Sequence, residues 1–227
     1  MANNNKSQAQ AQQANNVGEA VSRTEEYIEK NKKTLSIIGI ALIVLIVGLW
    51  AVNHFYLQPR QVKALSALSA GEKLFQAGDF ECALNGEGDY EGFDAVIKEF
   101  KGTKAANLAQ AYAGIAKAQL GQYAEAIPYL QKFKGNDKMI APSVLAALGN
   151  CYAQAEDYAK AAATLVKAAK KADNNALSGS YLVQAGQLFE QLGNNAEALK
   201  VYKTVKEKYY QSTQASDIDK YIERVSK

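Results

Sequence analysis

Hydrophobic positions along the chain follow two patterns, which predict two kinds of helix. Residues 35–57, LSIIGIALIVLIVGLWAVNHFYL, carry no formal charge, and residues 37–52 within them have no polar side chain. After residue 60, apolar residues instead recur among polar ones at the spacing of one face of an α-helix. The two patterns predict an all-α chain with one apolar helix near the amino terminus and a set of amphipathic helices after it.

The apolar segment is predicted to be a single transmembrane helix over residues 35–57. In a helix its 23 residues would reach about 35 Å, which is enough to cross a hydrocarbon layer of about 30 Å. Its apolar run is longer than the roughly 7 to 15 residues of a cleaved signal peptide, so we expect a retained anchor. The residues expected to face the membrane include Ile37, Leu42, Leu45, Val47 and Trp50.

Positive charge around this segment predicts its orientation. Arg23, Lys30, Lys32 and Lys33 precede it, whereas only basic residues at 60 and 63 follow it closely. Because Lys and Arg accumulate on the cytoplasmic side of a membrane span, we expect a cytoplasmic amino terminus and an exported carboxy-terminal part. In a bacterium with two membranes, the anchor would lie in the inner membrane and the exported part in the periplasm.

The residues before the anchor divide into two parts. Residues 1–16 are rich in Asn and Gln and have no large apolar side chain, so we expect a disordered tail. Residues 17–34 place Val17, Val21 and Ile28 roughly on one face among charges, which predicts a cytoplasmic amphipathic segment.

The part beyond the anchor repeats itself. Two sets of small residues recur with spacings of 35 and 37 residues, and they are Gly114, Gly149 and Gly186, and Ala126, Ala161 and Ala198. Small side chains allow two helices to cross closely, so each repeat is predicted to be a pair of helices. Gly121 and Gly193, with Glu156 at the equivalent position, are predicted to form the turn within each pair.

These repeats resemble the tetratricopeptide repeat family, whose unit has about 34 residues. Leu148, Gly149, Tyr152, Tyr158 and Ala161 match its pattern. The resemblance implies an α-solenoid of helix hairpins, with three repeats over residues 107–212. A degenerate first repeat is expected over residues 58–106, with its second helix split by the insertion NGEGDYEG. A capping helix over residues 213–227, opened by the serine at 216, should cover the end of the stack.

The resemblance also implies which residues line a partner groove. Carried over position by position, the groove residues are Leu108, Ala111, Ile115, Gln119, Asn150, Gln154, Val183, Gln187, Glu190 and Gln191. None is basic, so recognition of a carboxy-terminal carboxylate is disfavoured. A neutral groove rich in amides suits an apolar helix or an extended backbone. The alternative is that this surface only packs against a neighbouring helix.

Composition argues against several other functions. With 26 basic and 23 acidic residues, the net charge of +3 gives no support to nucleic-acid binding. One histidine and two cysteines cannot build a common Cys/His zinc site. In an oxidising compartment Cys82 and Cys151 could pair, or they could remain two separate, mostly buried thiols. We therefore expect no cofactor, no metal, no small-molecule substrate and no enzymatic activity.

Two clusters of charged residues are typical of solvent-exposed surface. The acidic residues Glu87, Asp89, Glu91 and Asp94 lack the spacing of a calcium loop and are typical of a solvated insertion. Lysines gather on the second helices of the last two repeats, at positions 167, 170, 171, 200, 203, 206 and 208. Such runs are typical of solvated faces, although they could meet anionic lipid or an acidic partner.

The whole layout resembles the ancillary subunit family of the bacterial Sec translocon. The matching features are a short tail, the segment EKNKKTLSIIGIALIVLIVGLW and degenerate tetratricopeptide units beyond it. This resemblance implies a non-enzymatic adaptor whose partners are translocon subunits, a periplasmic prolyl isomerase or exported clients. A scaffold of another envelope assembly machine is the alternative, and an enzyme of unknown type comes third.

Overall fold

The computed structural model describes residues 29–226, which fall into two compact units. One unit ends at Pro59 and the other begins at Arg60, and each is described by itself. The expected tail, residues 1–16, and most of the expected amphipathic segment, residues 17–28, lie outside the described residues.

The first unit contains the apolar helix α2, Lys32–Val52, followed by the π-helical turn Asn53–Leu57. No side chain of α2 is buried, and all five expected membrane-facing residues, Ile37, Leu42, Leu45, Val47 and Trp50, are more than half exposed. Such a continuous apolar surface is unfavourable in water. Within residues 29–226, one helical stretch is long and apolar enough to cross a membrane, and it is the stretch that contains α2.

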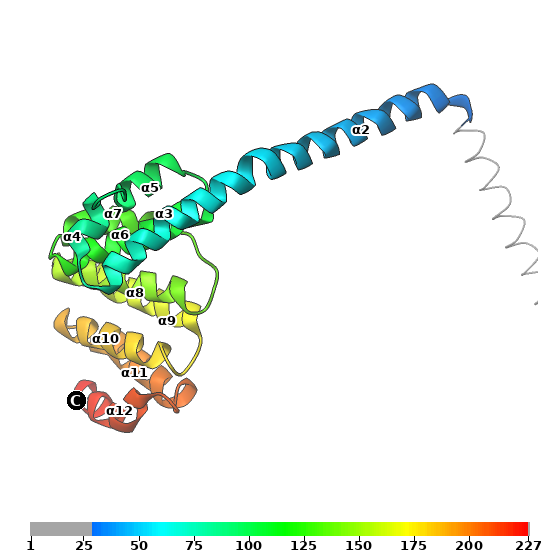
Figure 1. Cartoon of the computed structure of the whole chain (residues 1–227). Coiled ribbons are helices and arrows are strands. Elements are labelled where there is room, and N and C mark those ends of the chain that lie inside the picture. Colours follow the sequence, from blue (N-terminus) through cyan, green and yellow to red (C-terminus); the bar gives the residue numbers. More distant parts are fainter. Residues whose placement is uncertain (1–28, 227) are drawn as a thin grey trace, which may run out of the picture. The chain divides into compact units, whose positions relative to one another are not determined.

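The second unit is a succession of antiparallel helices that pack on their neighbours along the chain (Figure 1). Residues 29–226 contain no strand beyond one isolated bridge, so the all-α prediction is confirmed. The elements are α3 Gln58–Gln76, α4 Phe80–Asn85, α5 Phe93–Glu99, α6 Lys104–Gln119, α7 Tyr123–Lys132, α8 Ile140–Gln154, α9 Tyr158–Ala172, α10 Ser178–Gln191, α11 Asn195–Lys208, the 3₁₀ turn η2 Thr213–Asp217 and α12 Ile218–Val225.

A glycine facing a large side chain fixes each hairpin. Gly149 on α8 is buried, and a Cβ added there would lie 2.9 Å from Leu165 Cγ on α9. The same contact recurs in the hairpins on either side, where Gly114 faces Leu130 and Gly186 faces the ring of Tyr202. The large partners are therefore spaced by 35 and 37 residues, as the glycines are. The two helices of each hairpin therefore cross at the glycine, where one helix has no side chain.

The turns within the hairpins adopt the left-handed backbone that the repeat pattern predicts. Gly121 and Gly193 have φ of 77° and 71°, and Glu156 at the equivalent position has φ of 62°. The residue after the turn then caps the second helix in two cases, because Asp157 accepts from the Lys160 N–H and Asn194 accepts from the Glu197 N–H. Glu156 keeps the turn despite the cost of a left-handed non-glycine residue.

After α3, an inserted turn separates two short helices, α4 and α5. The inserted turn closes through two backbone hydrogen bonds between Glu87 and Tyr90. Tyr90 then reaches back to donate to the Ala83 carbonyl at 2.9 Å, and its ring packs where Gly71 of α3 has no side chain. The insertion is therefore anchored to the hairpin by one aromatic residue.

The carboxy-terminal helix α12 covers the last hairpin. Ile218 and Val225 are buried against the core that α10 and α11 share, with Tyr221 and Ile222 packed beside them. The expectation that Ser216 caps this helix is wrong. Its hydroxyl donates to the Thr213 carbonyl inside the 3₁₀ turn, and the α-helix begins only at Ile218.

The glycine contact gives a direct stability test. Gly149→Leu should lower the free energy of unfolding by about 1–3 kcal/mol or more, because Leu165 occupies the space that the new side chain needs. The measurement is urea unfolding of the full chain in mild detergent, followed by circular dichroism. Ala163→Leu adds the same side chain at an exposed position of α9 and should change stability by no more than about 0.5 kcal/mol. Equal stability of the two variants would contradict the hairpin register.

Candidate protein-binding surface

The expected groove residues lie on the first helices of three consecutive hairpins, α6, α8 and α10. Leu108, Ala111, Ile115 and Gln119 are on α6, Asn150 and Gln154 are on α8, and Val183, Gln187, Glu190 and Gln191 are on α10. Helices α6 and α8 are in contact. Helices α8 and α10 are bridged by a hydrogen bond of 3.3 Å between the hydroxyls of Ser143 and Tyr181. The three first helices therefore follow one another across the unit.

Five of these residues form a row of exposed amides, called the amide row below: Gln119, Asn150, Gln154, Gln187 and Gln191. On α8 and on α10 the two amides are four positions apart, so they lie on the same face of their helix. All five are exposed, and in residues 29–226 none of these side chains makes a hydrogen bond or an ion pair. Each can therefore offer both a donor and an acceptor to a partner.

Two of the expected groove residues are instead part of the core. Ala111 is 3% exposed and lies in a cluster with Val144 and Leu148 of the next hairpin. Val183 is 8% exposed and lies in the cluster that α8 to α12 share. Ala111 and Val183 therefore pack against neighbouring helices and are not open to a partner. Leu108 and Ile115 are partly buried in the same cluster as Ala111 and keep part of their surface open.

Glu190 is engaged by the carboxy-terminal helix. The Arg224 guanidinium of α12 donates to both of its carboxylate oxygens, each at 2.6 Å, and the Tyr202 hydroxyl donates to one of them. The hydrogen bond from Arg224 holds the pKa of Glu190 below its usual value, while burial and the Glu190 charge raise the pKa of Tyr202. Because its carboxylate is bound by Arg224 and Tyr202, Glu190 is not available to a partner protein. Sequence reasoning missed Arg224, since nothing local relates residues 34 positions apart.

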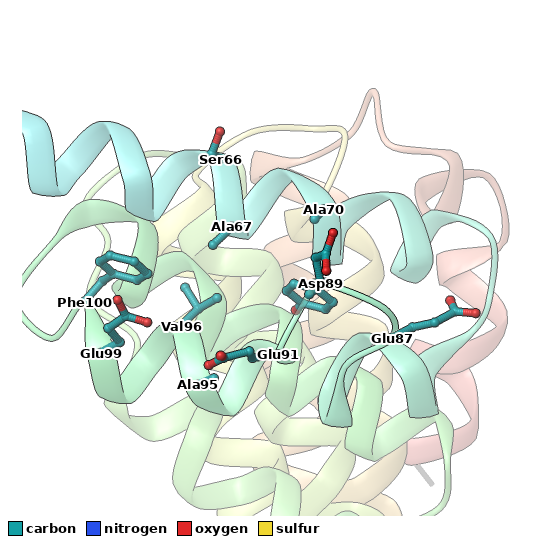
Figure 2. Close-up of a pocket in the computed structure, with 11 residues that line it drawn as sticks. Ser66, Ala67, Ala70, Glu87, Asp89, Glu91, Ala95, Val96, Glu99 and Phe100 are labelled. Carbon is teal, nitrogen blue, oxygen red and sulfur yellow. The ribbon is translucent and has the colours of Figure 1, made fainter.

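A separate pocket of about 550 Å³ lies between α3, the inserted turn and α5 (Figure 2). Ala67, Ala70, Val96 and Phe100 supply its apolar lining, and the carboxylates of Glu87, Asp89, Glu91 and Glu99 are spread around it. The lining contains no histidine, cysteine or basic residue. The polar groups of the lining are therefore carboxylates and the hydroxyls of Ser66 and Tyr90, and no hydrogen bond between a hydroxyl and a carboxylate of the lining is present.

Near the same insertion, Asp79, Cys82 and Glu87 bring three potential ligand atoms within 4.8 Å of one another. Asp79 already accepts a hydrogen bond from the Cys82 N–H, as the cap of α4. Asp79 and Glu87 are exposed, which is common for acidic groups that bind no metal. Asp79 therefore has a structural role at the start of α4, which needs no metal.

Both cysteines are free thiols, as one of the two alternatives expected. Cys151 is 2% exposed within the cluster of Val144 and Leu148, and burial raises its pKa. Cys82 is hydrogen-bonded to Asp79, which raises its pKa as well. A raised pKa disfavours the thiolate, so neither thiol is activated for chemistry.

Two segments of the chain match models of known families. One tetratricopeptide repeat model matches residues 144–177, which cover most of α8 and all of α9, and another matches residues 179–207, which cover nearly all of α10 and α11. No curated protein matches the chain. The chain therefore carries tetratricopeptide repeats, which support a role in protein–protein interaction.

The contact between Glu190 and Arg224 predicts a stability effect. Glu190→Gln should lower the free energy of unfolding at neutral pH by about 1–2 kcal/mol, because it removes the partner of a half-exposed arginine. Since the native pKa of Glu190 is lowered, its contribution is complete above the unfolded pKa and is lost as the pH falls through the native value.

The measurement is urea unfolding of the full chain at several pH values. The difference between wild type and Glu190→Gln should shrink as the pH falls below about 4.3. Glu197→Gln is the matched control, because Glu197 pairs with Lys200 at the surface, and it should cost less than about 0.5 kcal/mol. Identical effects of the two changes would show that α12 is not held by Glu190.

Proposed function

We propose that this chain is a membrane-anchored adaptor that binds a segment of another protein along the amide row. The observation that carries the proposal is the repetition of exposed amides without internal partners on the first helices of consecutive hairpins. The three hairpins over residues 107–212 act as three tetratricopeptide repeats, after a degenerate first repeat over residues 58–106.

The chemistry of the amide row favours a neutral partner segment. An amide side chain can accept from a peptide N–H and donate to a peptide C=O, so a row of amides suits an extended backbone or the polar edge of a helix. The partly open side chains of Leu108 and Ile115 lie on the same helix as Gln119 and add apolar contact. The row contains no cation to grip a terminal carboxylate.

The anchor would hold the repeats near the membrane and its proteins. A helix in the bilayer keeps the repeats close to the membrane surface, which raises their effective concentration toward anything anchored or emerging there. The flanking lysines and the layout of tail, anchor and repeats support a bacterial inner membrane protein with a cytoplasmic amino terminus and periplasmic repeats. The partners proposed on this basis are Sec translocon subunits, a periplasmic prolyl isomerase or exported clients. A scaffold for another envelope assembly machine is the second candidate.

Site-specific photo-crosslinking in the native membrane tests the amide row. A photoreactive residue at Gln154 should give a discrete adduct, while the same residue at Lys203, which is exposed on the second helix α11, should not. Asn150→Ala with Gln187→Ala should weaken the adduct at Gln154 roughly tenfold or more, since each lost hydrogen bond to the partner contributes about 1 kcal/mol.

Mass spectrometry of the adduct then separates the two candidate settings. Peptides from translocon subunits, the isomerase or an exported client support the first, and components of another envelope machine support the second. Adducts that form equally at Gln154 and Lys203, and that survive the double change, would contradict binding along the amide row.

Charge reversal before the anchor tests the orientation. Changing Lys30, Lys32 and Lys33 to Glu should impair or invert insertion, because it removes the positive charge that holds the amino terminus in the cytoplasm. A reporter fused after Lys227, active on one side of the membrane only, reads the outcome. Lys203→Glu, far from the anchor in sequence, should leave the reporter unchanged. A reporter that stays exported in the triple variant would count against the orientation.

A further inference from the structure

Six lysines gather along one edge of the second unit, where successive hairpins connect. A pocket of about 760 Å³ at the α5–α6 connection and a pocket of about 410 Å³ at the α7–α8 connection share Lys134. The lysines that line them, called the lysine edge below, are Lys98, Lys101, Lys104, Lys132, Lys134 and Lys171. Figure 1 shows the α7–α8 and α9–α10 connections on the same side of the helix stack.

The positive charge of this edge is not balanced within the second unit. No Asp or Glu lines either pocket, and none of the six lysines forms an ion pair in residues 29–226. Other lysines of the unit are paired, such as Lys117 with Glu125 and Lys208 with Asp173. An edge of six free cations therefore attracts anions.

The acidic residues beside this edge in the sequence do not pair with its lysines, and Asp173, near Lys171, pairs instead with Lys208. Asp137, in the α7–α8 connection, accepts hydrogen bonds from the backbone N–H groups at the start of α8, and these bonds lower its pKa. Glu99 lines the other pocket, shown in Figure 2, and not the pockets of the lysine edge. Neither carboxylate forms an ion pair with a lysine of the edge.

Apolar side chains are exposed in the connection that carries Lys134. Met139 and Ile140, at the end of the α7–α8 connection, are 59% and 50% exposed. Phe133 and Leu145 line the smaller pocket beside Lys134 and Lys171. Cations beside exposed apolar side chains are the composition of a surface that lies at a bilayer interface, with the charges at the phosphates and the apolar groups below them. An acidic peptide would explain the lysines but not the exposed Met139 and Ile140.

The chain enters the second unit at this same edge. Arg60, the first residue of the unit, donates to the Glu99 carbonyl at 2.7 Å, and the Lys104 N–H donates to the Gln61 side chain at 3.2 Å. Leu57, the last residue of the expected membrane span, precedes Arg60 by three residues. Three residues span at most about 10 Å, so Arg60 cannot lie farther than that from Leu57 at the end of the expected span.

We infer that the lysine edge binds the phosphate headgroups of anionic lipids in the bilayer that holds α2. The inference rests on the proposed anchor but not on the amide row. By this contact the connections between hairpins, rather than the helices themselves, would meet the lipid headgroups. Electrostatic attraction to anionic lipid contributes about 1 kcal/mol for each lysine near the surface.

Native mass spectrometry of the full chain in detergent tests this inference, with phosphatidylglycerol or phosphatidylcholine added in turn. One variant carries Lys101→Gln, Lys104→Gln and Lys134→Gln. The matched control carries Lys73→Gln, Lys167→Gln and Lys203→Gln, which removes the same charge from three exposed lysines that lack ion pairs and line neither pocket. The basic residues next to α2 are intact in both variants.

Wild type and control should prefer phosphatidylglycerol, and the lysine-edge variant should bind it roughly 10- to 100-fold more weakly. Circular dichroism should be the same for all three proteins. Equal binding by all three, an equal loss in both variants, or no preference in the wild type would overturn the inference. So would an acidic peptide, such as oligoglutamate, that binds the wild type and not the lysine-edge variant while the lipid preference is absent.

The amide-row variant Asn150→Ala with Gln187→Ala serves as a further reference. It should keep the wild-type lipid preference, because neither residue lines the two pockets. In the wild type, no lipid preference together with a discrete crosslink at Gln154 would overturn only the lysine edge. A wild type that keeps its lipid preference but gives no crosslink at Gln154 would overturn only the amide row.

Discussion

The close approach of two helices at a glycine is the constraint on which the second unit depends. Gly114, Gly149 and Gly186 each leave space that a leucine or tyrosine of the paired helix fills. This contact sets the depth and register of a hairpin, and its repetition every 35 or 37 residues sets the register of the hairpins relative to one another. A side chain at a given distance from the glycine therefore occupies the same place in every hairpin. The regular exposure of the amides is a consequence of packing in the core.

This regularity separates two roles within the first helices. The face toward the core carries small residues, such as Ala111, while the positions one and five residues after the buried glycine of α8 and α10 carry exposed amides. At the carboxy-terminal end, α12 covers the last hairpin and engages Glu190 through Arg224. The stack is thus closed at one end by an ion pair and apolar contact, as a solenoid requires. The amides without partners are the side chains that we propose bind a partner.

The hairpins and their turns could be predicted because both depend on local, repeated signals. Even the left-handed backbone of Glu156 follows from its position in the repeat. The groove stays a prediction, and the sequence could not show that Ala111 and Val183 are buried, since their burial depends on the side chains of neighbouring hairpins. The pairing of Glu190 with Arg224, the anchoring of the insertion by Tyr90 and the lysine edge all join residues far apart in sequence. Ser216 matched a capping pattern, but the chain forms a 3₁₀ turn there first. Contacts between residues far apart in sequence leave no periodic pattern from which they could be predicted.

Hydrogen–deuterium exchange of the full chain in lipid nanodiscs, alone and with a partner identified by crosslinking, tests the central claim most directly. The account predicts that the partner slows exchange in peptides from α6, α8 and α10, which carry the amide row, and leaves α7, α9 and α11 unchanged. Protection confined to the second helices, or to the acidic pocket beside α3 and α5, would contradict recognition by the amides.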